Sequence, residues 1–187
     1  WPTLVLVTIT MMSTFSMSVL LPLYFEGALG TTAFLAGIIM LAPVLANTFI
    51  TLLGGRIMDK CGEWPLLPAG FAIATVGFAI MAIGAPSLSL AAMLAGSILA
   101  FSGIGLVFSP SQTAGLRTLP PEQHPFGVAL STTFVQIAAC IGPSLYTGIL
   151  ASAQSNALAD GANAQIATAQ GFSNAMVVAT LVAFLGF

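Results

Sequence analysis

Side chains that could do acid–base or nucleophilic chemistry are scarce in this sequence of 187 residues. It holds three basic and five acidic residues, and half of these eight charges fall within the stretch LLGGRIMDKCGEWP at residues 53–66. They are Arg56, Asp59, Lys60 and Glu63. The stretch separates two long apolar runs, so its charges are expected in a connection between two buried elements.

The other reactive residues form no catalytic or metal-binding pattern. One histidine, His124, and two distant cysteines, Cys61 and Cys140, do not make a zinc site. The sequence has no G-x-S-x-G nucleophile turn and no phosphate loop, and Gly103-Ile-Gly105 lacks the third glycine and preceding strand of a dinucleotide fingerprint. We expect no enzyme, metal or cofactor, so an ion gradient is the only energy source, if there is one.

The composition predicts that the chain lies in a lipid bilayer. Charged residues make up 4% of the sequence and apolar residues 58%, whereas soluble domains have roughly 25% and roughly 45–50%. Such a chain cannot cover a water-exposed surface. Its net charge of −2 and its lack of Lys/Arg clusters exclude nucleic acid as a partner.

Six apolar runs have about the length that a membrane-spanning helix needs, which is about 20 residues. They cover residues 3–25, 33–55, 65–85, 88–109, 126–151 and 172 to the end. The turns at 56–64 and 111–125 and a polar segment at 153–170 are expected to connect them. The predicted fold class is an all-α membrane protein, a bundle of six transmembrane helices. Because both ends of the chain lie inside apolar runs, residues 1–187 are expected to be truncated at both ends.

The basic residues predict which way the bundle faces. Arg56, Lys60 and Arg117 fall in the turns at 56–64 and 111–125, which six alternating spans place on the same side of the membrane. Cytoplasmic loops are enriched in Lys and Arg. These two turns are therefore expected to be cytoplasmic.

The order of residues in the charged turn is more specific than its composition. Gly55, three residues, Asp59, Lys60, one residue and Gly62 resemble the G-x-x-x-D-(R/K)-x-G-(R/K)-(R/K) signature of the major facilitator superfamily. That signature joins the second and third helices of each six-helix half, as it does here. The sequence departs at residues 63–64, where the pattern has two basic residues; weakened copies are typical of the C-terminal half.

Two longer stretches resemble one branch of that superfamily, the 14-helix drug:proton antiporters. LPLYFEGALGTTAFLAGIIMLAP (21–43) is similar to its L-P-L-Y-x-Q…G…A-G…P stretch, with Glu26 in place of Gln. GIGLVFSPSQTAGLRTLPPEQHPFGVALSTTFVQIAACIG (103–142) resembles a later segment, with Val135 where a basic residue often precedes Gln136. The series covers roughly residues 20–150 in order.

The resemblance implies the C-terminal half of a proton-coupled efflux transporter in a bacterial cytoplasmic membrane. Its partners would be the bilayer, a small lipophilic or cationic substrate, protons and a missing N-terminal half, and it would work by alternating access. The family signature implies a cytoplasmic conformational latch, broken when the carrier opens inward. Its residues are Gly55, Arg56, Asp59, Lys60 and Gly62.

Polar side chains within the spans are the candidates for the substrate pathway. One face of the first span repeats at i, i+3, i+4 and i+7 and carries Thr10, Ser13, Thr14 and Met17. Two pairs share faces at i and i+4, Asn47 with Thr51 and Thr132 with Gln136. The first face either lines a cavity or packs against another helix. The amides of Asn47 and Gln136 are expected to point inward, because an unpaired amide in hydrocarbon is costly.

Two further features have a functional and a static interpretation. Gly142 and Pro143 interrupt the fifth span, and the kink that proline usually causes either serves as a gating hinge or is static. Glu26 stands near an extracellular span end. It is either an interfacial carboxylate or, if drawn into the bilayer, a proton-coupling group.

The predicted function is therefore proton-coupled drug efflux, with two alternatives. A metabolite uniporter or symporter would be favoured by a charged cavity. A non-transporting membrane scaffold would be favoured if Asn47, Gln136 and the Thr10 face all pack against protein with no water-accessible cavity.

Overall fold

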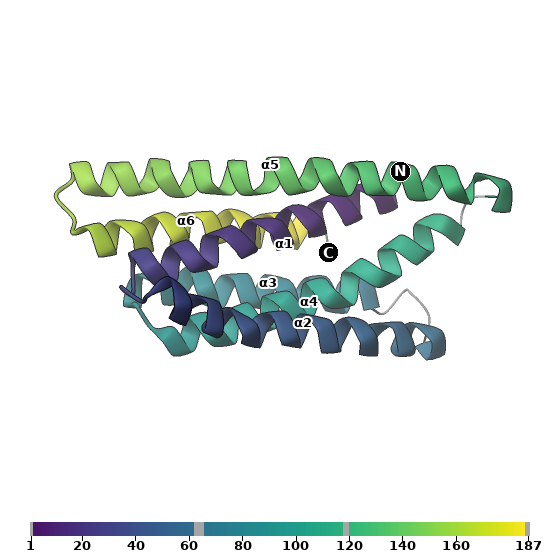
Figure 1. Ribbon diagram of the computed structural model, residues 1–187, viewed down its shortest axis with the longest axis horizontal. Helices are drawn as coiled ribbons and strands as arrows, with labels where there is room; N and C mark the ends of the chain where they lie inside the picture. The colour runs from purple at the N-terminus through teal and green to yellow at the C-terminus, as the bar shows by residue number, and fades with distance from the viewer. Residues whose placement is uncertain (1, 62–65, 118–119, 186–187) are drawn as a thin grey trace.

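The computed structural model describes residues 2–61, 66–117 and 120–185, and its ribbon is a bundle of long helices (Figure 1). The long helices are α1 (Pro2–Gly27), α2 (Ala33–Cys61), α3 (Leu66–Gly84), α4 (Leu90–Arg117), α5 (His124–Ala159) and α6 (Ala164–Leu185). Two short 3-10 helices, η1 (Ala85–Ser87) and η2 (Pro121–Gln123), precede α4 and α5. No strand occurs among the described residues. The predicted all-α class is confirmed.

Five of the helices, α2 to α6, are long and apolar enough to cross a membrane by length and composition. The sixth, α1, has 26 residues, which at 1.5 Å per residue is about 39 Å. That length exceeds the hydrocarbon thickness of about 30 Å. Every spanning segment is helical, as expected where backbone groups have no water to bond.

The predicted helix ends at the charged turns were wrong. Helix α2 continues to Cys61 and α4 continues to Arg117, so Arg56 lies within α2 and not in a turn. Methionine, arginine and lysine are good helix formers, and charge ends the hydrocarbon-embedded part of a helix without ending the helix. The first latch residues, including Arg56, therefore lie on the part of α2 that continues beyond the apolar region.

Most of the polar segment at 153–170 was also wrongly predicted as a connection, since only residues 160–163 lie between two helices. Helix α5 runs to Ala159 and α6 begins at Ala164, eight residues before the expected start of the sixth span at 172. The 36 residues of α5 span about 54 Å, much more than the hydrocarbon thickness. Alanine, glutamine and asparagine extend the helices past the membrane without breaking them.

The order of packing places α2 and α5 at opposite edges of the bundle. Helix α1 packs between α5 and α4, α2 packs mainly on α4, and α3 and α6 pack on each other and on α4 and α5 respectively (Figure 1). Consequently 11% of the spanning window of α2 and 22% of that of α5 are buried, against 50% for α4 and α6. The two edge helices are largely uncovered by this chain.

Small residues set the closest contact in the bundle, between α3 and α4. A side-chain carbon on Gly103 would clash with the backbone of Ala74, and one on Gly77 would clash with the backbone of Ala100. Lipid supplies no hydrophobic drive between helices, so close backbone approach is what holds such a pair together. The α3–α4 pair thus forms the tight centre that positions the helices carrying the candidate site.

Candidate functional site

The amide predicted to turn inward from α2 does so. Asn47 Nδ2 donates a hydrogen bond of 2.7 Å to the backbone oxygen of Phe101 on α4, and Thr51 Oγ1 donates one of 2.8 Å to the oxygen of Asn47. Gly105 makes this approach possible, because a side-chain carbon there would lie 2.8 Å from Thr51 Oγ1. In this structure the pair joins α2 to α4.

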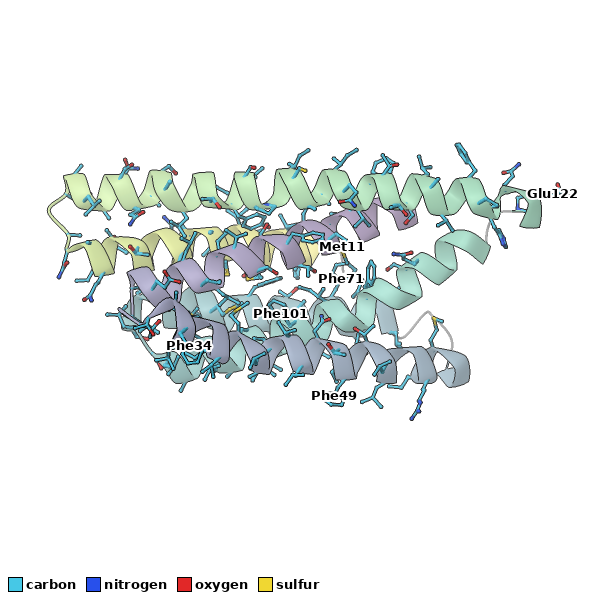
Figure 2. All side chains as sticks on the ribbon, in the orientation of Figure 1. Met11, Phe34, Phe49, Phe71, Phe101 and Glu122 are labelled. Atoms are coloured by element: carbon cyan, nitrogen blue, oxygen red, sulfur yellow. The ribbon has the colours of Figure 1, made fainter. Side chains whose placement is uncertain are left out.

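The two helices joined by the Asn47 contact differ in the exposure of their phenylalanines, as Figure 2 shows. Phe34 and Phe49 on α2 are 80% and 63% exposed, whereas Phe101 on α4 is 4% exposed (Figure 2). Helix α2 therefore presents an apolar face away from the bundle and attaches to it through the Asn47 contact. That outward face needs lipid or another protein to cover it.

The polar face of α1 is turned into the bundle. Ser13 is buried and donates a 3.1 Å hydrogen bond to the oxygen of Ile9, and Met17 is fully buried in the main core. Thr14 is half-buried, and the side chain of Thr10 lies outside the described part of the structure. In this conformation the described members of the face pack against helices of the same chain.

Helices α1 and α5 cross at Gly142. A side-chain carbon at Gly142 would lie 2.7 Å from the backbone oxygen of Met12 and 3.0 Å from Ser16 Oγ. Ser16 Oγ itself donates a 2.6 Å hydrogen bond to that same oxygen. Pro143 follows directly, yet α5 is one helix that runs without a sharp bend in Figure 1. Pro143 therefore lies inside one continuous helix, next to the contact between Gly142 and α1.

The polar pair on α5 faces outward. Thr132 and Gln136 are both exposed, and Thr132 Oγ1 donates a 2.8 Å hydrogen bond to the oxygen of Val128 in its own helix. The expectation that Gln136 points inward is therefore not met, because none of the other helices that the structure describes covers this face of α5. Ile137 and Ile141 beside it are also exposed.

The latch residues lie at the end of α2. Gly55 is half-buried and Arg56 is exposed. Asp59 and Lys60 are in the last helical turn, with side chains outside the described part, and Gly62 lies outside the described residues. Helix α2 ends at the same end of the bundle at which α4 ends and α5 begins (Figure 1). The three basic residues thus gather at one end, as the topology prediction requires.

The opposite end is held by aromatic and hydroxyl side chains that the sequence did not single out. Tyr24 Oη, buried near the end of α1, donates a 2.9 Å hydrogen bond to the oxygen of Ala85, and its ring lies 4.7 Å from that of Phe172. Ser173 Oγ on α6 donates one of 2.7 Å to the oxygen of Ala82. A tyrosine inside an apolar run was the available signal. Glu26, two residues beyond Tyr24, is exposed.

No metal-binding cluster occurs among the described residues, where no three His, Cys, Asp or Glu side chains come together. Cys140 is exposed and not in a disulfide. The substrate-pathway candidates on α1, α2 and α5 are hydroxyls, amides and one thioether, all neutral. Such side chains can hydrogen-bond to a ligand and enclose it.

Together the fold and these contacts define a multi-pass helical membrane protein with two uncovered edge helices. A family model described as Major Facilitator Superfamily matches residues 1–143. The chain therefore belongs to the Major Facilitator Superfamily, a family of membrane transporters, as the charged signature predicted.

The curated relatives include drug-resistance proteins. The chain is 33% identical over 189 residues to "Lincomycin resistance protein LmrB" of Bacillus subtilis, covering 97% of this chain and 39% of the relative. It is 34% identical over 180 residues to the protein of the same name from Listeria monocytogenes, covering 96% and 36%. A more distant relative is "Riboflavin transporter RibZ" of Clostridioides difficile, 24% identical over 136 residues. The chain thus spans less than two fifths of the length of each of these relatives.

Proposed function

We propose that this chain is the C-terminal six-helix half of a proton-driven drug exporter in a bacterial cytoplasmic membrane. The observation that carries the proposal is the match of nearly the whole chain to lincomycin resistance proteins. The matched part is only 39% of the Bacillus relative, which leaves room for another helical half. The exported compounds would be lipophilic and often cationic.

The uncovered faces of α2 and α5 support an alternating-access mechanism for this exporter. Two helical halves that rock about a midmembrane site need faces that meet only in the complete transporter. Gln136 and Thr132 on α5 and the apolar face of α2 are exposed in this chain. The second half would cover them, and the substrate would bind between the halves.

The neutral character of these faces favours lipophilic substrates. None of the pathway candidates on α1, α2 and α5 carries a charge, so an anionic metabolite would lose its hydration without gaining an ion pair. A lipophilic cation loses less, because its charge is shielded by apolar groups. The neutral pathway candidates therefore suit a lipophilic cationic drug better than an anionic metabolite.

The cytoplasmic end of α2 would act as the latch. Asp59, beside Arg56 and Lys60, would face the N-terminal end of a helix of the other half, where the helix dipole favours an anion. Breaking that contact would accompany opening to the cytoplasm. The backbone of Asp59 lies in the last turn of α2, which places it at the cytoplasmic end required of such a latch.

The proposal is tested with the complete transporter in inside-out vesicles with an acidic interior. We expect a fluorescent lipophilic cation to be taken up while the pH gradient is discharged. Asp59→Ala is expected to abolish uptake. Glu122→Ala is the matched control, because Glu122 is an exposed acid of the connection at the same end of the bundle. Absence of uptake and of proton leak across chemically different drugs would refute the exporter.

Thiol labelling separates a carrier from a scaffold. Asn47→Cys and Gln136→Cys are made in a variant lacking the exposed Cys140 and treated with a membrane-impermeant thiol reagent. A carrier is expected to show labelling that changes with substrate. Complete protection at both positions, with and without substrate, would favour a scaffold. The riboflavin transporter relative makes riboflavin the metabolite to include in the substrate panel.

A further inference from the structure

A polar groove opens between the end of α5 and the first turns of α6. Its volume is about 380 Å³. Two polar side chains on α5, the residue that follows α5 and two side chains on α6 line it, namely Ser152, Asn156, Asp160, Gln170 and Asn174. It lies at the end of the bundle opposite the basic residues (Figure 1), which the positive-inside rule places outside the cell. No step of the proposed transport cycle uses these residues.

The groove faces away from the proposed substrate pathway. The other side of the α5–α6 pair is marked by Thr168, which accepts a 2.8 Å hydrogen bond from Gln154 Nε2. A side-chain carbon on Gly27 of α1 would lie 3.0 Å from Thr168 Cγ2, so α1 covers that side. The groove is therefore on the outside of the bundle, and because α6 carries none of the pathway candidates, we assign this side of the α5–α6 pair to lipid.

The same helix faces become apolar toward the middle of the membrane. On α6, Val177 and Leu181 follow Gln170 and Asn174 at i+7 and therefore lie on the same side of the helix. They are 46% and 58% exposed. On α5, Leu145 precedes Ser152 at the same spacing and is 46% exposed. A ligand that fits this surface has a polar end and an apolar tail.

The negative charge of Asp160 determines which headgroup the groove favours. Asp160 follows the C-terminus of α5, and its amide donates a 3.0 Å hydrogen bond to the oxygen of Asn156. The helix dipole is negative at this end, so carboxylate and dipole both favour a cation. The chain has no Lys or Arg in any connection on this side. The amides of Asn156 and Asn174 can donate hydrogen bonds to phosphate oxygens without a positive charge.

We propose that this groove binds the headgroup of an ethanolamine phospholipid from the outer leaflet. The primary ammonium would donate to the Asp160 carboxylate, the phosphate would accept from the amides, and the acyl chains would lie along Leu145, Val177 and Leu181. A choline headgroup has no N–H donor for Asp160, and a net anionic headgroup would be repelled by it. This proposal rests on the membrane topology and does not depend on which substrate is carried.

The turn between α5 and α6 is built to hold Asp160 in place. Gly161 has a φ of +85°, a conformation that glycine adopts without strain. The amide of Ala162 donates a 2.9 Å hydrogen bond to the oxygen of Ala157, and that of Gly161 a 3.0 Å bond to Leu158. The carboxylate is thus carried by a hydrogen-bonded turn.

The test is lipid retention measured by native mass spectrometry. The complete purified transporter is mixed with equal amounts of phosphatidylethanolamine and phosphatidylcholine that have the same acyl chains. We expect ethanolamine lipid to be retained in excess. Asp160→Asn should reduce that excess about two- to fivefold, the effect of losing one partly exposed charge pair. Glu26→Gln, which neutralises another exposed acid at the same end, should leave the excess unchanged.

A second variant guards against a disturbed turn. Asn174→Leu removes a phosphate donor from α6 without touching residues 160–163, and it should lower the retention of both lipids while far-ultraviolet circular dichroism stays unchanged. Equal retention of the two lipids by the unmodified protein, or an excess unaltered by Asp160→Asn, would overturn the proposal. Displacement of the lipid by an equal concentration of soluble phosphoethanolamine would overturn the lipid as the occupant.

Discussion

Gly105→Ala should weaken the attachment of α2 to the bundle. The new methyl group would lie 2.8 Å from Thr51 Oγ1, 3.0 Å from the oxygen of Asn47 and 3.3 Å from Asn47 Nδ2. Ordinary contact begins at 3.4 Å, so the nearest atom is about 0.6 Å too close. Thr51 Oγ1 cannot turn away freely, because it donates a hydrogen bond to Asn47. Relief must come from moving α2, which lengthens the 2.7 Å bond from Asn47 to Phe101.

The size of the effect follows from two opposing contributions. Overpacking by one methyl group costs about 1–3 kcal/mol, and a strained hydrogen bond adds up to about 1 kcal/mol. Replacing glycine by alanine inside a helix returns about 0.5–1 kcal/mol. The middle of these ranges is a net loss of about 2 kcal/mol. In a domain of about 150–250 residues each kcal/mol lowers Tm by about 2–4 °C, so the complete transporter, which is longer, should lose less than about 8 °C.

The measurement is thermal unfolding of the complete transporter in detergent, followed by tryptophan fluorescence. Gly37→Ala is the control, because Gly37 lies in α2, the helix that packs against Gly105, with nothing within 4 Å of the added carbon. It should leave Tm unchanged or slightly higher. Thr51→Ala in the Gly105→Ala background removes the nearest clashing atom and should restore part of the loss. A Gly105→Ala variant as stable as Gly37→Ala would refute the reasoning.

Three further changes test other contacts. Tyr24→Phe keeps the ring and removes the bond to Ala85, so Tm measurements should show a loss of about 1 kcal/mol; an unchanged Tm would argue against that bond. Gly142→Ala should separate α5 from α1 and lower Tm, whereas Gly148→Ala, which meets nothing within 4 Å, should not; equal values would contradict the crossing. Glu26 is exposed, so Glu26→Gln should retain drug-coupled proton flux in vesicles, and loss of that flux would assign proton coupling to it.

Hydropathy predicted the class and the number of helices, but the sequence placed their ends less well. Bilayer thickness imposes a minimum apolar length, which five of the six runs met and the last, 172–187, nearly met. Arg56 and the polar residues 153–159 mark where the hydrocarbon ends, and both continue a helix. Helix propensity would have predicted these longer helices. No proline stands between Arg56 and the end of α2 at Cys61, or between residue 153 and the end of α5 at Ala159.

Side-chain partners could be predicted only by type. An amide at position 47 had to find a polar partner, but its partner, the backbone oxygen of Phe101, is 54 residues away and depends on Gly105 having no side chain. Such a contact leaves no pattern in one sequence. The groove at Asp160 was missed because its polar residues were read as a connection.

The exposure of Gln136 limits what can surround α5 in the membrane. An amide facing hydrocarbon without a partner costs about 1–3 kcal/mol by the protein scale, and Thr132 beside it already bonds its own helix. The same helix carries exposed Ile137 and Ile141, which favour an apolar cover. If only lipid surrounded this face, Gln136 would have no hydrogen-bond partner from outside the chain. If only water surrounded it, Ile137 and Ile141 would be exposed to water. A mixed surface of this kind is best satisfied by another protein surface with water at its polar positions, which is what the proposed second half of the transporter would supply.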